Sequence, residues 1–578
     1  ATFGASDDLQ IYHSGSHSII ADVGTGDLLL RGNNARLQNS DGSSTFIHGF
    51  NAGAVDINYA GNTKLATTAT GIDVTGISVS DGMSTNTLGT SNFIAGVNAG
   101  NSIASGGNYN TVVGDEAGTD ITTGDSNTGV GYGSLNETTT GGSNTAIGVN
   151  SLEANTTGSN NTALGVQALD TNTTASNNTA VGFQSLYANT TGTANVAVGS
   201  QSGDALTTGH YNTMVGHGSL SADTKGTRSV AIGMQALAAQ NFTSETSAYN
   251  TAVGMSAGAA VTTGQYNTLI GGLAGDAQTT ADHNVALGVS TLTTNTKANK
   301  NVAIGSNALN TFNVTSDTDT YNTAVGYSAG GTVTTGTNNT FVGALAGDGT
   351  DDGVGNTCVG KSAGSANLGD NNTLIGLEAG EVATGADNTV MGRSAGITLT
   401  SGSNNLFLGH DSGRSGSPGG NITTGSNEIV LGDENITEAH IQVDWTVASD
   451  ARDKTDFTPL DLGLDFVNAL APVTYKWDKR SKYGDKSAEG YDLNAQTPDG
   501  THKEDWLDIG FKAQEVEALE IAAGYNKDNS TNLVSSHTGD GKQMGLQYSK
   551  FVPILVKAIQ EQNALIEALT ARITTLEG

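Results

Sequence analysis

Short apolar runs recur along most of the chain at a nearly constant spacing. Between residues 92 and 432 an N-T-x-x-G unit returns every 17 residues in most repeats, with two longer steps of 21 residues. One apolar patch directly precedes the Gly, and a second patch, an S/A-L or A-G pair, follows a few residues later. Because no helical period is present, we predict two short strands and two turns in each repeat.

A stack of such repeats forms a parallel β-solenoid. About twenty coils, each advancing about 4.8 Å, form a rod on the order of 95 Å long. The Asn four residues before nearly every Gly is expected to form a ladder or to cap the turns, and Ser229 replaces it once. The two longer steps, at 241–245 and 312–319, are predicted to be surface loops. So thin a coil leaves one apolar face open, which favours self-association around the rod axis.

The chain on either side of the rod follows other patterns. In residues 1–90, apolar runs between Gly, Asn, Asp and Ser predict β modules. The strand positions are Leu9, Ile11, Ile19, Leu28, Leu30, Val55, Ile57 and Val74. In the junction at 433–448, Ile441, Val443, Trp445 and Val447 alternate with polar residues and predict a strand. From about 548 to 577, apolar residues at 3-4 spacing predict a coiled-coil helix, with Gln562 as a polar residue in its seam.

Composition narrows the functional classes. The chain has 80 Gly, 5 Pro and 5% aromatic residues, unlike a usual globular enzyme. Its net charge of −32 predicts no nucleic-acid partner and no anionic membrane partner. Cys358 is the single cysteine and occupies an apolar slot, so we expect a buried thiol. No membrane-spanning run and no N-terminal signal is evident, so we predict no membrane insertion and folding in the cytoplasm of the producing cell.

The strongest candidate for chemistry is the stretch 449–454, which has the form S-D-x-R-x-K. A Ser hydroxyl is a poor nucleophile and needs an adjacent base. Lys454 can accept its proton only where desolvation or a neighbouring positive charge, such as Arg452, favours the neutral amine. Asp450 either orients the turn or opposes the reaction by favouring the ammonium. In isolation the same stretch also fits a helix-starting turn with Ser449 or Asp450 as N-cap.

Three further stretches follow in order: L-A-P-V-T-Y-K-W at 470–477, I-G-F-K-A-Q-E-V at 509–516, and the C-terminal helix. Together with S-D-x-R-x-K they resemble the self-cleaving intramolecular chaperone domain of bacteriophage tail fibres and endosialidase tailspikes. The resemblance covers 449–578. It implies that the chain cuts its own Ala448–Ser449 bond in a single turnover, with Ser449 as nucleophile, Lys454 as base and no cofactor.

Other residues of this region are assigned structural roles. Trp477, Phe511 and Val516 are predicted to lie in the core of an α+β domain. Gln514 and Glu515 belong to the A-Q-E-V signature, and a structural role is expected for both. Residues 479–503 are rich in Lys, Asp and Gly and are predicted to be an exposed insertion.

The rod at 91–432 resembles the left-handed β-roll in the head domains of trimeric autotransporter adhesins, which implies a homotrimer. The stretches 8–13 and 53–59 resemble β modules of tail fibres of marine phages. The Ile and Leu seam of the C-terminal helix by itself favours dimers, whereas the two resemblances favour trimers. The fold class is therefore mainly β, with an α+β C-terminal domain.

These patterns predict a phage tail fibre located in the virion. It would attach to other tail proteins near its N-terminus and bind a host cell-surface glycan or protein. The alternatives are a tailspike polysaccharide depolymerase and a bacterial trimeric surface adhesin.

Several weaker candidates for binding are assigned structural or solvated roles. His13 and His17 are expected to be surface residues, and no metal site is predicted. Thr pairs such as Thr122–Thr123 and Thr207–Thr208 are spaced as regularly as the Thr arrays of ice-binding solenoids, but Thr equally suits strand ends and turns. Asp348, Asp351 and Asp352 are expected to form a solvated acidic loop.

Overall fold

The computed structural model describes residues 1–3, 8–24, 27, 29, 34–50, 55–59, 62–68, 71–74, 87–443, 445–486, 488, 490–529, 531 and 533–578. The chain forms two compact units, Ala1–Ser84 and Thr85–Gly578. Leu28, Leu30 and positions 53–54, which entered the prediction of N-terminal strands, lie outside the described residues.

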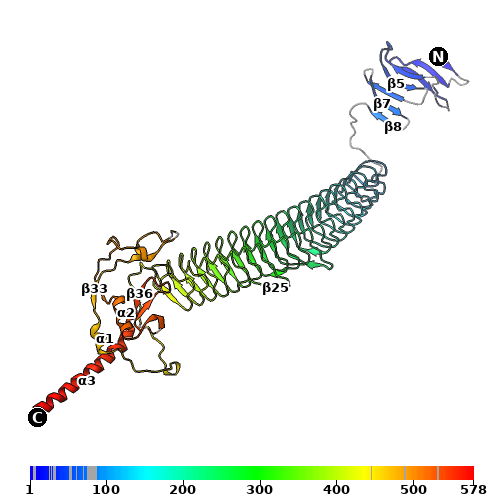
Figure 1. Ribbon diagram of the computed structural model, residues 1–578. Helices are drawn as coiled ribbons and strands as arrows, with labels where there is room; N and C mark the ends of the chain where they lie inside the picture. Colours follow the sequence, from blue (N-terminus) through cyan, green and yellow to red (C-terminus); the bar gives the residue numbers. More distant parts are fainter. Residues whose placement is uncertain are drawn as a thin grey trace. The chain divides into compact units, whose positions relative to one another are not determined.

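The first unit contains two antiparallel sheets, as its alternation of short apolar runs and turn residues predicts (Figure 1). One sheet has the order β1-β2-β3 and the other β4-β5-β6-β7-β8. The strands are β1 (Thr2–Phe3), β2 (Leu9–His13), β3 (Ser18–Asp22), β4 (Asn34–Gln38), β5 (Thr45–Phe50), β6 (Val55–Tyr59), β7 (Asn62–Thr68) and β8 (Gly71–Val74).

The second unit begins with a shaft made of one parallel ladder of short strands (Figure 1). Each strand ends one residue before a repeat Gly, and its middle residue points into the coil. The strands are β9 (Phe93–Ala95), β10 (Thr111–Val113), β11 (Thr128–Val130), β12 (Thr145–Ile147), β13 (Thr162–Leu164), β14 (Thr179–Val181), β15 (Val196–Val198), β16 (Thr213–Val215), β18 (Val230–Ile232), β20 (Thr251–Val253), β21 (Thr268–Ile270), β22 (Val285–Leu287), β24 (Val302–Ile304), β26 (Thr323–Val325), β27 (Thr340–Val342), β28 (Thr357–Val359), β29 (Thr373–Ile375), β30 (Thr389–Met391), β31 (Leu406–Leu408) and β32 (Ile429–Leu431). The predicted solenoid and its register are confirmed.

The prediction of two strands per coil is wrong, because the second apolar patch of a coil lies in a turn. Leu152 and Leu169 in this patch have φ of 54° and 52°, a left-handed conformation that interrupts a strand. In other coils Gly occupies the same position, as Gly258 does with φ of 59°. This shared conformation explains why the sequence alternates between S/A-L and A-G.

The two kinds of coil fill their interior differently. Where the left-handed residue is Leu169, the residue three positions later is the buried, polar Asn172. Where it is Gly258, that later residue is the buried, apolar Val261. A Cβ on Gly258 would lie 2.7 Å from Leu269 Cδ1 and 3.3 Å from Val261 Cγ2. Most coils therefore hold one large apolar side chain at either the first or the second of these two positions.

A ladder of buried Asn side chains connects the coils, as predicted. The Asn144 N–H donates to Asn127 Oδ1 (3.0 Å), and Asn144 Nδ2 donates to a turn carbonyl, Gly158 O (2.8 Å). At Ser229 the ladder continues through another residue. Gln240 Nε2 donates to Ser229 Oγ (3.0 Å), and Gln240 Oε1 accepts from Asn250 Nδ2 (2.9 Å). The polar groups inside the coil are thus paired with one another.

The Thr pairs have a role in the turns. The Oγ1 of Thr122, Thr207 and Thr262 donates to a backbone carbonyl of the next coil, at 2.9, 2.9 and 3.1 Å. These bonds connect successive turns along the shaft and account for the regular spacing of Thr.

The two inserted loops lie where the sequence places them, and each adds a two-residue strand beside the preceding coil. β17 (Gly226–Thr227) pairs with β19 (Thr246–Ser247), and β23 (Ala298–Asn299) pairs with β25 (Thr318–Asp319). The prediction of a wholly exposed loop is wrong at Phe242 and Phe312, which are 5% and 0% exposed. Their rings bury apolar area inside the coil, which favours the inward position.

The C-terminal part is a small α+β domain whose apolar core includes the predicted Val516. Its elements are η1 (Ala451–Asp453), α1 (Leu464–Ala469), β33 (Val473–Tyr475), η2 (Arg480–Lys482), η3 (Leu493–Ala495), β34 (Asp508–Gly510), α2 (Ala513–Ala522), η4 (Lys527–Asn529), β35 (Ser535–His537), β36 (Met544–Leu546), η5 (Tyr548–Lys550) and α3 (Phe551–Glu577). Phe511 packs against this core. Trp477 was predicted to be buried but is 43% exposed, because it lies beyond the end of β33.

The strand predicted at the junction is not formed. The described residues of 433–448 contain no strand, and the side chains of Val443, Trp445 and Val447 are exposed. An alternating pattern alone does not stabilise a strand, which needs a neighbouring strand to pair with. The seam of α3 is likewise exposed along its length, at positions such as Ile559, Ile566 and Ile573.

Candidate functional site

The stretch 449–454 folds into a single 3-10 turn. Asp450 is the N-cap of η1, and its carboxylate accepts from the Arg452 N–H at 2.9 Å. The same carboxylate pairs with the Arg452 guanidinium at 2.6 Å. The predicted helix-starting turn is therefore present, with Asp450 rather than Ser449 as its cap.

This turn brings Ser449 and Lys454 together. Lys454 Nζ lies 2.5 Å from Ser449 Oγ and 3.4 Å from the Ser449 carbonyl oxygen. A hydroxyl in direct contact with an amine is the arrangement that proton transfer from Ser to Lys requires. Both side chains are exposed in the single chain, so the amine is still solvated.

Arg452 does not have the role expected of it. Its hydrogen bonds to Asp450 lower the pKa of that carboxyl and raise the pKa of the guanidinium. Because Asp450 is the direct partner of Arg452, the guanidinium charge is largely neutralised within the turn. Burial of the amine would have to come from other groups packed around Lys454.

Two glutamates that sequence reasoning missed hold the domain together. Glu520 of α2 is fully buried and accepts from the N–H groups of Leu533, Val534 and Ser535 at 2.8, 2.6 and 2.9 Å. Glu561 of α3 accepts from the Leu464 N–H at the start of α1 at 2.7 Å, which lowers the pKa of Glu561. Both belong to helices in which Glu normally faces solvent, so the sequence carries no local signal of these contacts.

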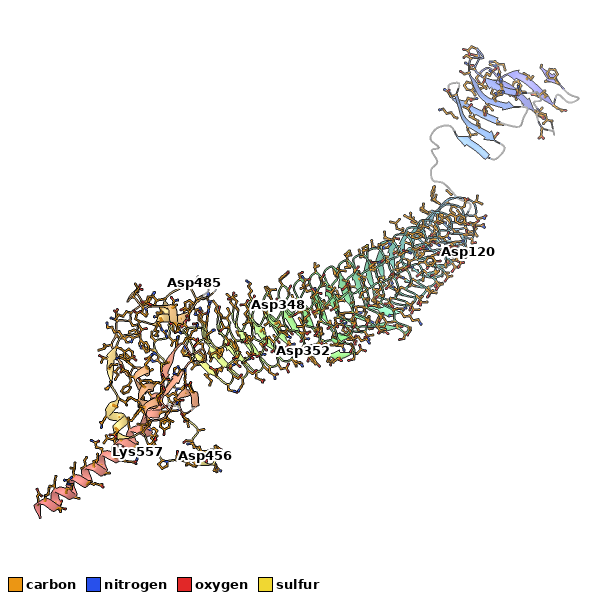
Figure 2. All side chains as sticks on the ribbon, viewed as in Figure 1. Asp120, Asp348, Asp352, Asp456, Asp485 and Lys557 are labelled. Carbon is orange, nitrogen blue, oxygen red and sulfur yellow. The ribbon has the colours of Figure 1, made fainter. Side chains whose placement is uncertain are left out.

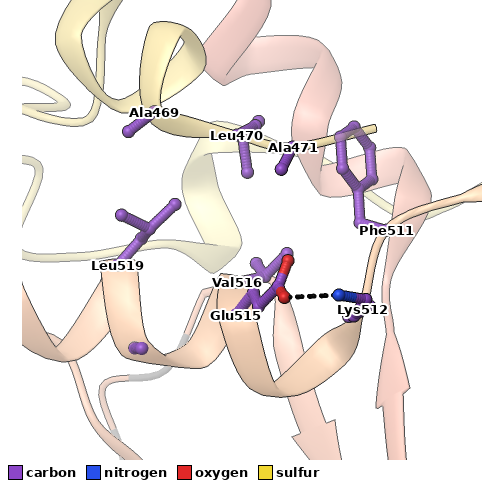
Figure 3. Close-up of a pocket in the computed structure, with 9 residues that line it drawn as sticks. Ala469, Leu470, Ala471, Phe511, Lys512, Glu515, Val516 and Leu519 are labelled. Carbon is purple, nitrogen blue, oxygen red and sulfur yellow. Dashed lines mark hydrogen bonds and ion pairs between the residues drawn. The ribbon is translucent and has the colours of Figure 1, made fainter. Parts of the chain in front are cut away.

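The L-A-P-V and A-Q-E-V stretches face each other in this domain. The end of α1, with residues 469–471, and the start of α2 enclose an apolar pocket of 290 Å³ (Figure 3). Glu515 at its rim pairs with Lys512 at 2.7 Å, whereas Gln514 is exposed. The contact of Glu515 agrees with a structural role for the signature.

The C-terminal domain packs against the last coil of the shaft. Lys486 forms an ion pair with Glu434, and Lys479 Nζ donates to the Glu434 carbonyl oxygen at 2.8 Å. The Asn421 N–H donates to Asp540 Oδ2 at 3.0 Å. The prediction that 479–503 is an exposed insertion is wrong, because part of it covers this coil and buries Leu493. Burial in this contact lowers the pKa of Lys486.

The other candidate sites have no second feature that indicates binding. His13 and His17 are exposed, and the described residues contain no group of three or more side chains suited to a metal ion. Asp348 and Asp352 lie on the surface of the shaft (Figure 2). Cys358 is buried, which raises the pKa of its thiol. Within the described part of the chain, no helix combines the length and the hydrophobicity needed to cross a bilayer.

One carboxyl pair bears on the depolymerase alternative. Glu153 and Asp170 lie on adjacent coils and share a hydrogen bond. Burial and then the neighbouring Asp170 charge raise the pKa of Glu153, and burial raises that of Asp170. Glycoside hydrolases keep their two carboxyl groups about 5–9.5 Å apart to accommodate the sugar or a water. A pair in direct contact does not meet that requirement.

Comparison with known proteins identifies the C-terminal region. Residues 449–525 match the family described as chaperone of endosialidase, and the match begins at Ser449. The curated proteins and the solved structures gave no significant match. The chain therefore carries a chaperone-of-endosialidase domain behind a β-solenoid shaft, the organisation of a tail-fibre-like protein with an intramolecular chaperone.

Proposed function

We propose that this protein is a homotrimeric phage tail fibre that binds the host cell surface and removes its own chaperone domain. The contact between Lys454 Nζ and Ser449 Oγ, at 2.5 Å, carries the proposal. It joins the first residue of the matched domain to a side chain able to act as its base. The fibre belongs to the virion and attaches to other tail proteins near its N-terminus.

Exposed apolar side chains support assembly into a trimer. We call the residues directly before and after the repeat glycines the apolar stripe. Its exposed members are Val130, Tyr132, Ile147, Val149, Leu164, Val166, Phe183, Val198, Ile232, Met234, Met255, Leu287, Val289, Tyr327, Val342, Leu377 and Met391. A stripe of this length, together with the exposed seam of α3, buries its area when three chains associate.

Trimer assembly also supplies what the dyad lacks. Three chains that meet around the junction bury the turn at 449–454 and favour a neutral Lys454. Lys454 then accepts the Ser449 hydroxyl proton while Oγ attacks the Ala448 carbonyl carbon. The Ala448–Ser449 C–N bond breaks, the Ser449 nitrogen takes up the proton, and an ester forms on Oγ. Water hydrolyses this ester and leaves the Ala448 carboxylate. Cleavage therefore follows correct assembly.

Intact mass and N-terminal sequencing of the freshly expressed chain test this proposal. We expect two fragments, one of them beginning at Ser449, and a trimer by light scattering. Ser449→Ala and Lys454→Ala should stay full-length and trimeric, whereas the control Lys550→Ala, at the exposed end of η5, should be cut normally. Cleavage at Ala448 in either dyad variant would refute the assigned roles.

A further inference from the structure

An exposed column of aromatic and cationic side chains runs along one edge of the shaft. It occupies the position directly before the Asn ladder in seven consecutive coils. Its members are Tyr211, Arg228, Tyr249, Tyr266, His283, Lys300 and Tyr321. Tyr249 and Tyr266 stack at 5.8 Å between ring centroids, and Tyr266 and His283 stack at 4.7 Å. The four tyrosines are 47% to 55% exposed, so the column is an accessible surface.

The column contains two copies of one structural module. Each copy is a coil with a cation in the column, followed by an inserted loop whose short strand pairs with that coil. The first module spans 225–249 and the second spans 297–321, so equivalent residues are 72 positions apart. Strands β18 and β24 of the two modules are separated by four steps of the ladder, which corresponds to about 19 Å along the shaft.

The two modules concentrate the positive charge of an acidic shaft. Residues 92–432 contain seven Lys and Arg, and four of them belong to the modules. These four are Lys225, Arg228, Lys297 and Lys300. In a chain with a net charge of −32, such local clustering favours an anionic partner at these coils.

The cation is free to bind in one module and neutralised in the other. In the second module, Lys300 Nζ forms an ion pair with Asp319 at 2.5 Å. Arg228 lies 5.4 Å from the Tyr211 ring and 5.8 Å from the Tyr249 ring, and its Nη1 donates to Ser247 Oγ at 2.6 Å. Ser247 stands 72 residues before Asp319, and no carboxylate among the described residues lies within ion-pair distance of Arg228.

We propose that Arg228, held between two tyrosine rings and the first inserted loop, binds a carboxylate group of an acidic host-surface polysaccharide. A planar guanidinium fixed by aromatic rings is suited to bidentate recognition of carboxylate. The linear column of tyrosines and the hydroxyl-rich edge beside it suit a long polyhydroxylated chain. This inference rests on the proposed host-surface function and names its ligand class and its site.

The site remains accessible in the proposed trimer. The column precedes the beginning of each strand, whereas the apolar stripe follows its end. Tyr249 and Met255 of one coil are six residues apart, which corresponds to about 20 Å of extended chain. Association through the stripe therefore leaves the column and both loops on the outer surface.

Binding of the full-length chain to immobilised polygalacturonate, with its methyl ester as the uncharged reference, tests the inference. We expect binding to polygalacturonate that falls about tenfold or more in Arg228→Gln, since a charge-assisted hydrogen bond is lost. Ser247→Asp, which copies the second module, should weaken binding to a similar extent. Asp319→Ser should free Lys300 and increase binding. Lys300→Gln and Arg393→Gln, an exposed arginine outside the modules, should bind as the wild type does.

Each outcome decides the inference. Equal binding to the acid and its ester, or unchanged binding in both Arg228→Gln and Ser247→Asp, overturns carboxylate recognition at this site. Equal binding to polyglutamate overturns the assignment to a polysaccharide. Circular dichroism spectra identical to the wild type exclude misfolding of the variants. Failure of the proposed fibre function is read separately, from the intact mass and the oligomeric state.

Discussion

Replacing Gln278 with Leu is expected to stabilise the shaft. Gln278 is fully buried three residues after the left-handed Gly275, and neither its Nε2 nor its Oε1 has a hydrogen-bond partner among the described residues. Equivalent positions after a left-handed Gly hold apolar residues, such as Val261 and Leu399. The position is thus built for an apolar side chain and holds an amide instead.

The magnitude follows from the cost of that amide. A buried polar group without a partner costs about 1–3 kcal/mol, and Leu removes this cost while it fills a similar volume. Gln240, at the same position of an earlier coil, provides the matched control. It donates to Asp223 Oδ2 at 2.7 Å and to Ser229 Oγ at 3.0 Å. Gln240→Leu leaves these groups unpaired and should cost about 3 kcal/mol or more.

Thermal unfolding followed by circular dichroism, at one protomer concentration and one scan rate, compares the two variants. We expect a higher midpoint for Gln278→Leu and a lower midpoint for Gln240→Leu. If both substitutions lower the midpoint to the same extent, the assignment of Gln278 as an unpaired amide is refuted. The opposite signs make the test independent of any general effect of Leu in the coil.

Three other predictions address the same shaft. Gly148→Ala should destabilise it by at least about 1–3 kcal/mol, because φ is 137° and a Cβ would lie 2.4 Å from Gly165 O; denaturant midpoints test this, with the unconstrained Gly272→Ala as control. Burial raises the pKa of Asp276 above 3.8, so its folded carboxyl stays protonated to higher pH and stability falls as pH rises through that range; Asp276→Asn should reduce the drop in melting temperature between pH 4.5 and 7.5. The Cys358 thiol should react with a disulfide reagent only in denaturant, and rapid native labelling would contradict its burial.

The repeat pattern was sufficient to predict the shaft but not its cross-section. N-T-x-x-G gave the correct positions of the strands and of the buried Asn, because a solenoid repeats its local geometry in every coil. It did not reveal that Leu152 adopts a left-handed conformation, which is unusual for a bulky residue. It also did not reveal that Gln240 completes the ladder at Ser229, since the two positions are 11 residues apart and meet only in the folded coil.

The candidate site was predictable where it depends on neighbouring residues. Ser449 and Lys454 are five positions apart, and one turn brings them together. The pairing of Arg452 with Asp450 instead of support for Lys454 reflects a competition between nearby charges that spacing does not decide. The contact of Lys486 with Glu434 depends on how the domain meets the last coil, and no short stretch encodes it.

The exchange between Leu and Gly at the left-handed position makes each coil a self-contained cassette. A coil of either kind presents the same ladder of Asn and Thr bonds to its neighbours, so whole coils are interchangeable where single substitutions are not. Gain or loss of a coil by recombination changes the reach of the fibre by about 4.8 Å and leaves the adjoining coils intact. The 72-residue offset between the two loop modules is the signature of such an event. Evolution of host range in this architecture can therefore proceed by counting coils as well as by replacing side chains.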